Sequence, residues 1–116
     1  MGVRRIKPNI RSDDFVASRA FYADVIGLDE SPGLDWILFF GTDDRAVQLS
    51  VMGPDATAPE HPDVSIEVDD VDEVHARAVA AGLEIVHPLT TEEWGLRRFF
   101  VRDPSGAVVN VTQHLG

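Results

Sequence analysis

Two neighbouring carboxylates could do chemistry together, since Glu67 lies on the predicted strand Val64–Val68 and Asp63 immediately precedes that strand. Asp63 and Glu67 are separated by four positions, so their side chains share strand parity and point to the same face. Two carboxylates that share a site can make a general base, because like charges resist ionising together. For Glu67, solvation or an ion pair with Lys7 is expected instead.

Other catalytic residue types are scarce. The chain has no cysteine, which excludes disulfides, thiolate metal sites and thiol nucleophiles. No Ser–His–acid arrangement is visible. His61 lies two residues before Asp63 and is either a displaced metal ligand or, as we expect, a loop histidine. Ordinary roles are expected for His75 in a helix, His87 near a strand end and His114 in the tail.

Aromatic side chains are placed where a flat ligand could stack. Trp36 and Phe40 share parity on one strand, and Trp94 lies at the mouth of another. An aromatic face over a cation contributes about 0.5–2 kcal/mol. The run from Ile37 to Phe40 is apolar on both faces, which predicts a pocket or an interface on one of them. Core packing is the expectation for Phe21, Tyr22, Phe99 and one of Phe39 or Phe40.

The charge balance limits the partners. The chain has 116 residues, 20 Asp and Glu against 10 Lys and Arg, and a net charge of -10. A nucleic-acid partner is not expected, because binding phosphates needs a basic stripe. The acidity either keeps the protein soluble or attracts a cationic small molecule. No apolar run approaches the length of about 20 residues that a membrane span requires, and a cytoplasmic protein is expected.

A weak internal repeat organises the chain. Asp13-Asp14 opens a helical pattern that ends at Gly27-Leu28, and Asp69-Asp70 opens another that ends at Gly82-Leu83. In each, Asp supplies an N-cap and Gly a left-handed residue after the C-terminus. Each helix is flanked by predicted strands, and the ranges are Arg4–Ile10, Asp29–Ser31, Trp36–Gly41, Ala46–Met52, Val64–Val68, Leu83–Leu89, Arg97–Arg102 and Ala107–Gln113.

This order predicts one α+β domain made of two βαβββ modules. The expected first module covers about residues 1–53, a connector about 54–62, and the second module about 63–116. Pro8 lies inside the first strand, where it cannot donate a ladder hydrogen bond, and marks an edge or a hinge.

The run from Trp94 to Gly106 is the most specific motif. Asp103-Pro104-Ser105-Gly106 reads as a tight turn in which Gly106 takes a positive φ and Asp103 accepts bonds from the turn's amides. Together with Phe21 to Leu28, this segment resembles the vicinal oxygen chelate superfamily of glyoxalases, ring-cleaving dioxygenases and bleomycin-resistance proteins. The resemblance spans nearly the whole chain and implies a curved sheet forming a cup, in a homodimer.

The same resemblance implies where a metal would bind. Metal-dependent members carry one ligand on each of four strands, and the matching positions here are Lys7, Gln48, Asp63 and Asn110. Lysine is cationic and repels a metal ion, and the two amides are weak neutral donors. The metal site therefore looks degraded, and no cofactor is expected.

The Trp-Gly-x-Arg and Asp-Pro-x-Gly segments resemble bleomycin-resistance proteins most closely. This implies a metal-independent protein that binds a small molecule, such as a cationic aromatic antibiotic or metabolite. Asp63 and Glu67 would meet the positive part of the ligand. The other expected ligand-binding residues, by strand parity, are Trp36, Phe40, Gln48, Trp94, Arg98 and Phe100.

Two other functions remain open. One is a lyase, isomerase or dioxygenase that uses a divalent ion of nickel, zinc, manganese or iron, held by Gln48, Asp63 and His61. The other is a protein–protein module that has kept the fold without binding a ligand.

Overall fold

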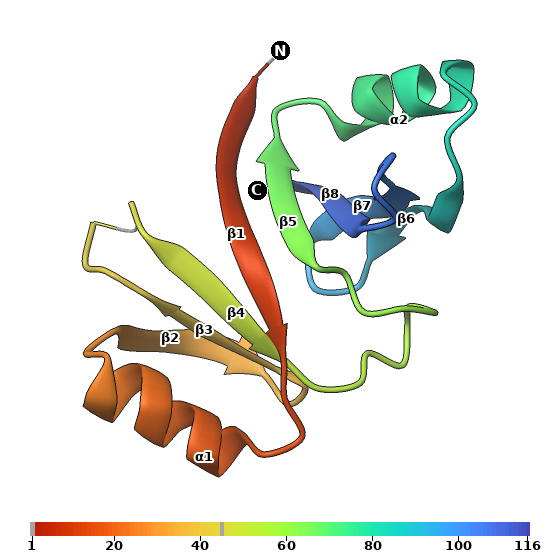
Figure 1. Ribbon diagram of the computed structural model, residues 1–116. Coiled ribbons are helices and arrows are strands. Elements are labelled where there is room, and N and C mark those ends of the chain that lie inside the picture. The colour runs from red at the N-terminus through yellow and green to blue at the C-terminus, as the bar shows by residue number, and fades with distance from the viewer. Residues whose placement is uncertain (1, 45) are drawn as a thin grey trace. The chain divides into compact units, whose positions relative to one another are not determined.

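The computed structural model describes residues 2–44 and 46–116 and contains two βαβββ modules (Figure 1). This arrangement confirms the predicted α+β fold. In the first module the strand order is β2-β3-β4-β1, and in the second it is β5-β8-β7-β6. The elements of the first are β1 (Val3–Arg11), α1 (Phe15–Arg19), η1 (Ala20–Val25), β2 (Asp29–Leu34), β3 (Ile37–Gly41) and β4 (Gln48–Met52).

The second module repeats the pattern. Its elements are β5 (Val64–Val68), α2 (Val71–Ala80), β6 (Ile85–Glu92), β7 (Leu96–Arg102) and β8 (Val108–His114). The first and last strands of each module run parallel, as β1 with β4 and β5 with β8, and the remaining pairs within the modules are antiparallel.

The chain divides into two compact units that differ slightly from the expected modules. The first unit is residues 7–56, and the second unit is residues 57–116 together with the N-terminal residues up to Ile6. The start of β1 joins the second unit through specific contacts. Arg4 pairs with Asp69, and the Asp69 amide donates to the Gly2 carbonyl at 3.0 Å. Pro8 lies just after the point where β1 passes from one unit to the other.

Both helices begin as the sequence predicts. The Asp14 carboxylate accepts a hydrogen bond from the Ala17 amide at 3.0 Å, and the Asp70 carboxylate accepts one from the Glu73 amide at 3.2 Å. Gly27 and Gly82 have the predicted positive φ, at 94° and 74°.

The first helix departs from the predicted core pattern. It changes at Ala20 from α to π geometry, with an Ile26 N–H to Phe21 C=O bond that spans five residues. Tyr22 still packs against the sheet, but the Phe21 side chain is left 50% exposed. The prediction that Phe21 is a core residue was therefore wrong, because the π turn alters the helical spacing on which it depended.

Each unit has its own apolar core on the helix side of its sheet. In the second unit, Val71 and Ala78 of α2 pack with Phe99 and Val111 of the strands. In the first, Leu38, Phe40 and Val51 pack under α1 and η1. Phe40 and Phe99 are therefore core residues, as predicted for Phe99 and for one of the pair Phe39 and Phe40.

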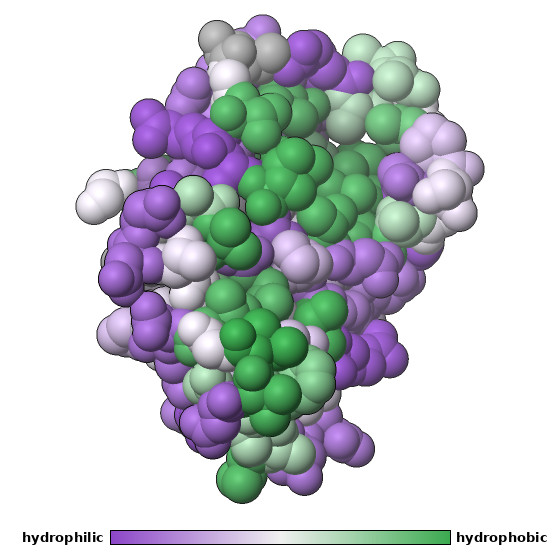
Figure 2. Space-filling view, turned by 60° about the vertical axis from the view of Figure 1, so that its left-hand side comes forward, coloured by the Kyte–Doolittle hydropathy of each residue, from purple (hydrophilic) through white to green (hydrophobic). Residues whose placement is uncertain are grey.

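Apolar side chains also reach the surface, where Figure 2 shows them gathered in patches between polar regions. Among the large hydrophobic residues of α1 and η1, Val16 (78%) and Val25 (73%) are the most exposed. Among the described residues, no helix has both the length and the apolar character needed to cross a membrane.

Candidate functional site

The face of the second unit's sheet that points away from α2 is polar. Register partners share a face, so the pairs between β5, β8, β7 and β6 form two rows across the sheet. The first row is Ser65, Asn110, Phe100 and His87. The second row is Glu67, Thr112, Arg98 and Thr90. We call these eight residues the polar face.

Several polar atoms on this face are buried without a hydrogen bond. In the described part of the second unit they are Glu67 Oε1, His87 Nε2, Asn110 Oδ1 and Thr112 Oγ1. Leaving such an atom unsatisfied costs about 1–3 kcal/mol, and buried polar atoms in proteins are almost always bonded. Glu67 Oε1 and His87 Nε2 nevertheless lie in ion-pair contacts, so within the described second unit Asn110 Oδ1 and Thr112 Oγ1 are the buried acceptors left without a partner.

Glu67 is the buried carboxylate of the polar face. Its Oε1 lies 3.0 Å from Arg5 Nε and 2.9 Å from His114 Nδ1, and its side chain is 7% exposed. Neither contact has the alignment of a hydrogen bond, so charge rather than hydrogen bonding holds this oxygen. The alternatives of a solvated Glu67 or a Lys7 pair were wrong. Lys7 Nζ instead lies 4.3 Å from the centre of the Phe39 ring in the first unit.

Arg98 is buried between aromatic rings. Its guanidinium carbon lies 5.2 Å from the Trp94 ring centre and 5.0 Å from that of Phe100. Its Nε donates to Glu92 Oε2 at 2.6 Å, and its Nη2 donates to Thr57 Oγ1 at 2.9 Å. The charge of Arg98 is thus balanced internally, and the residue fixes the positions of Trp94 and Phe100.

His87 contacts two residues that also contact Arg98, namely Phe100 and Glu92. Its ring lies 5.1 Å from that of Phe100, and its Nε2 is 3.4 Å from Glu92 Oε2. Neither His87, Glu92 nor His114 was predicted as a site residue. Strand parity could have found His114, because it follows Asn110 and Thr112 at intervals of two along β8.

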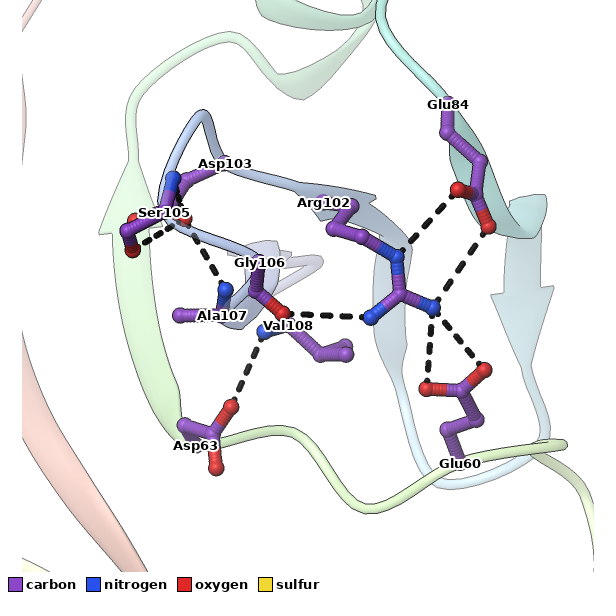
Figure 3. Close-up of polar contacts among 9 residues, drawn as sticks. All are labelled: Glu60, Asp63, Glu84, Arg102, Asp103, Ser105, Gly106, Ala107 and Val108. Atoms are coloured by element: carbon purple, nitrogen blue, oxygen red, sulfur yellow. Dashed lines mark hydrogen bonds and ion pairs between the residues drawn. The ribbon is translucent and has the colours of Figure 1, made fainter.

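The residues of the Asp-Pro-Ser-Gly turn have structural roles, as Figure 3 shows. Asp103 Oδ1 accepts from the Ser105 amide at 2.8 Å, from Ser105 Oγ at 2.6 Å and from the Ala107 amide at 2.9 Å, as predicted for this turn. The hydrogen bonds from Ser105, and then that from Ala107, lower the pKa of Asp103 from its ordinary value. Gly106 has the predicted positive φ, at 96°.

Two further side chains tie the connector to this region (Figure 3). Arg102 pairs with Glu60 at 3.0 Å and with Glu84 at 3.2 Å. Asp63 is exposed, and its Oδ2 accepts from the Val108 amide at 2.9 Å, at the start of β8. That bond gives Asp63 a structural task that the sequence did not reveal.

The remaining predicted ligand residues lie in the first unit. Phe40 faces Tyr22, with ring centres 5.6 Å apart, and so lies in the core under the helix rather than on an open face. The parity of Phe40 with Leu38 explains this position. Trp36 is half-buried in the turn before β3, and Gln48 opens β4 opposite Gly41.

The predicted metal positions have unsuitable chemistry. Lys7 brings a cation, Gln48 a neutral amide, and the Asp63 carboxylate is engaged by a backbone amide. Asn110 Nδ2 donates to Ser65 Oγ at 3.0 Å. Within residues 2–44 and 46–116, no group of three or more His, Asp or Glu side chains could hold a metal ion. These residues do not fit a divalent ion.

Comparison with known proteins places this arrangement in a family. The model of the Glyoxalase/Bleomycin resistance protein/Dioxygenase superfamily matches residues 5–111. No curated protein matches the chain in sequence. A superfamily member from Vibrio splendidus 12B01 is similar in structure, with 22% identity, a TM-score of 0.73 and coverage of 97% of this chain and 99% of that one.

Two longer enzymes contain a similar fold. The Mn(II)-bound glyoxalase from Novosphingobium aromaticivorans has 19% identity and a TM-score of 0.68 over 98% of this chain and 38% of that one. A variant of homoprotocatechuate 2,3-dioxygenase from B. fuscum has 19% identity and a TM-score of 0.71 over 98% of this chain and 33% of that one. At these identities the likeness concerns the fold.

Proposed function

The chain belongs to the Glyoxalase/Bleomycin resistance protein/Dioxygenase superfamily, and from that premise we propose that it is a metal-independent small-molecule-binding protein of the bleomycin-resistance type. Its ligand carries N–H donors or a positive charge beside an aromatic part. The polar face of the second unit supplies the binding groups.

The buried acceptors of the polar face carry this proposal. Glu67 Oε1 and Asn110 Oδ1 are acceptors, and Thr112 Oγ1 can accept as well. Glu67 and Thr112 are register partners on β5 and β8, and Asn110 lies two residues along β8 on the same face. This set of acceptors includes one carboxylate, which favours an amine, amidine or guanidine over an anion. The net charge of -10 favours the same class of ligand.

Trp94 and Phe100 support the aromatic part of the proposal. Phe100 is fully buried on the polar face, whereas Trp94 is half-buried in the turn between β6 and β7. Arg98 holds one side of each ring. Trp94 is therefore the ring that a flat ligand can still cover.

A thermal-shift and calorimetric screen of cationic aromatic antibiotics tests the proposal. A ligand at a hundred times its Kd stabilises the folded protein by about 2.7 kcal/mol. The variant Glu67→Gln should lose most of the binding, and Glu73→Gln, which removes an exposed carboxylate of α2, should keep it. Equal binding by both variants would contradict the proposed site.

A second candidate is a divalent-metal lyase, isomerase or dioxygenase, which the similarity to the Mn(II)-bound glyoxalase and to the dioxygenase favours. Elemental mass spectrometry decides between the two after incubation with nickel, zinc, manganese or ferrous iron and desalting. The binding proposal predicts empty protein, and stoichiometric retention of one metal would favour the enzyme instead.

A further inference from the structure

A short stretch of the connector is tied to β7 at two points. Thr57 Oγ1 accepts a hydrogen bond from Arg98 Nη2 at 2.9 Å. The Glu60 carboxylate accepts hydrogen bonds from Arg102 Nη2 at 3.0 and 3.1 Å (Figure 3). We call residues 57–60 the strap. Because Arg98 and Arg102 are four positions apart on one strand, both side chains leave β7 on the side of the polar face. The strap therefore lies on that side of the sheet.

Phe100 lies between the two arginines on the same side of β7. Its side chain points away from α2, yet it is fully buried. The strap spans the interval from Arg98 to Arg102, and so it lies across the position of Phe100. Asn110, the register partner of Phe100 on β8, also has a buried acceptor oxygen. The strap is thus placed to cover a part of the polar face where a ring and an acceptor are neighbours.

The strap is held by polar contacts rather than by apolar packing. Three of its four residues are exposed and Ala58 is half-buried, so the strap buries little apolar surface of its own. Segments with few buried apolar contacts open at a low cost in free energy. The chain that follows is firmly placed, because Pro62 is fully buried and Asp63 exchanges two hydrogen bonds with Val108. Movement of the strap therefore need not disturb β5.

Neither arginine depends on the strap for its charge partner. Arg98 Nε donates to Glu92 at 2.6 Å, and Arg102 Nε donates to Glu84 at 3.2 Å. When the strap leaves, both guanidinium groups keep a carboxylate, so no buried charge is left uncompensated. The strap can therefore open and close again while both arginines stay in place.

We propose that the strap is a lid over the polar face, which opens to admit the ligand by releasing its two arginine contacts. The open strap uncovers Phe100, so that an aromatic ligand meets this ring beside Asn110 Oδ1. The closed strap excludes the ligand from both groups. This inference rests on the proposed binding function and names what controls access to the same site.

A ligand-free experiment tests the lid. The double variant Thr57→Val/Glu60→Gln removes both strap contacts and nearly keeps the side-chain shapes, so its strap should be open for a larger share of the time. A soluble paramagnetic agent should then broaden the NMR signals of the Phe100 ring at least about threefold more than in the wild type. Phe99, on the α2 face of the same strand, is the internal reference and should not change.

Asp72→Asn is the matched control variant. Asp72 accepts hydrogen bonds from Arg97, which also belongs to β7 but lies on the α2 side. The substitution weakens an ion pair of the same kind without touching the strap, so the broadening of Phe100 should stay at the wild-type level. Equal broadening of Phe100 in the double variant and in the wild type overturns the lid.

Binding of the cationic aromatic dye ethidium, followed by fluorescence, tests the gating role. The double variant should bind with an apparent Kd at least about threefold lower than the wild type, because more of the protein is open. Equal affinity, together with greater exposure of Phe100, overturns the gate and leaves the binding function intact. Weaker binding by the double variant also overturns it, because the strap would then hold the ligand. No binding by either protein overturns both.

Discussion

The two faces of the sheet β5-β8-β7-β6 are built from alternate residues of the same strands. One face is apolar, and the other carries buried polar atoms without hydrogen bonds. On the α2 side, Phe99, Val101 and Val111 bury apolar surface against the helix. On the other side, Glu67, Asn110 and Thr112 are equally buried. Asn110 Oδ1 and Thr112 Oγ1 have no hydrogen bond, and Glu67 Oε1 has only its contacts with Arg5 and His114. The first face is filled by apolar packing, whereas the second keeps the acceptors Asn110 Oδ1 and Thr112 Oγ1 without a hydrogen bond. Strand parity thus separates the apolar core from the face proposed to bind the ligand.

The largest expected effect on stability comes from a substitution that disrupts the apolar face. Phe99→Ala should cost about 3–5 kcal/mol of unfolding free energy, because it leaves a cavity against α2. Urea denaturation measures the loss. A cost below about 1 kcal/mol would show that α2 does not depend on this ring.

Breaking the interior ion pair of the polar side should be nearly as costly. Arg98→Met leaves the Glu92 carboxylate buried without its guanidinium partner, at a cost of about 3–5 kcal/mol. Adding Glu92→Gln removes the uncompensated charge and should recover part of the loss. If the double variant is no more stable than Arg98→Met, the pair is not the stabilising contact.

A change at Trp94 should separate binding from stability. Trp94→Ala should weaken binding of a cationic aromatic ligand by about 1–3 kcal/mol, with little change in Tm, because the ring is only half-buried. Calorimetry and a melting curve on the same sample test this. A large fall in Tm would instead make Trp94 a core residue.

The smallest expected effect concerns acid stability at the turn after β7. Hydrogen bonds from Ser105 and Ala107 lower the pKa of Asp103 in the folded protein. Asp103 therefore contributes stability above its unfolded pKa, and this contribution is lost as the pH falls through the lower folded value. Asp103→Asn should flatten the acid limb of the stability curve, as measured by denaturation between pH 2 and 6. An unchanged acid limb would contradict the assignment.

Much of the fold was predictable because its signals are local. The N-caps Asp14 and Asp70 and the turn at Gly106 depend on short-range hydrogen bonds and backbone conformation, which residue type reveals. Strand parity also placed Glu67, Arg98 and Phe100 on one face. The first helix was mispredicted at Phe21 because a change from α to π geometry leaves no mark in the periodicity.

The site was less predictable because its partners are distant in sequence. Arg5, Glu67 and His114 meet only when β1 and β8 flank β5, and no spacing along the chain encodes that contact. Arg98, predicted as a ligand contact, donates hydrogen bonds to Glu92 and Thr57, which its position on the strand could not reveal. Asp63, predicted to meet the positive part of the ligand, also accepts a hydrogen bond from the Val108 amide, 45 residues away in the sequence.

The most direct test of the central claim is to map a bound cation on the two faces by NMR. With ethidium or an antibiotic from the screen, the account predicts shifts at the Asn110 side-chain amide, the Thr112 amide and the Trp94 indole, with α2 and Val111 nearly unchanged. Binding that perturbs the α2 face or the first unit, and leaves Asn110 and Thr112 unmoved, would contradict the claim that the polar face is the ligand site.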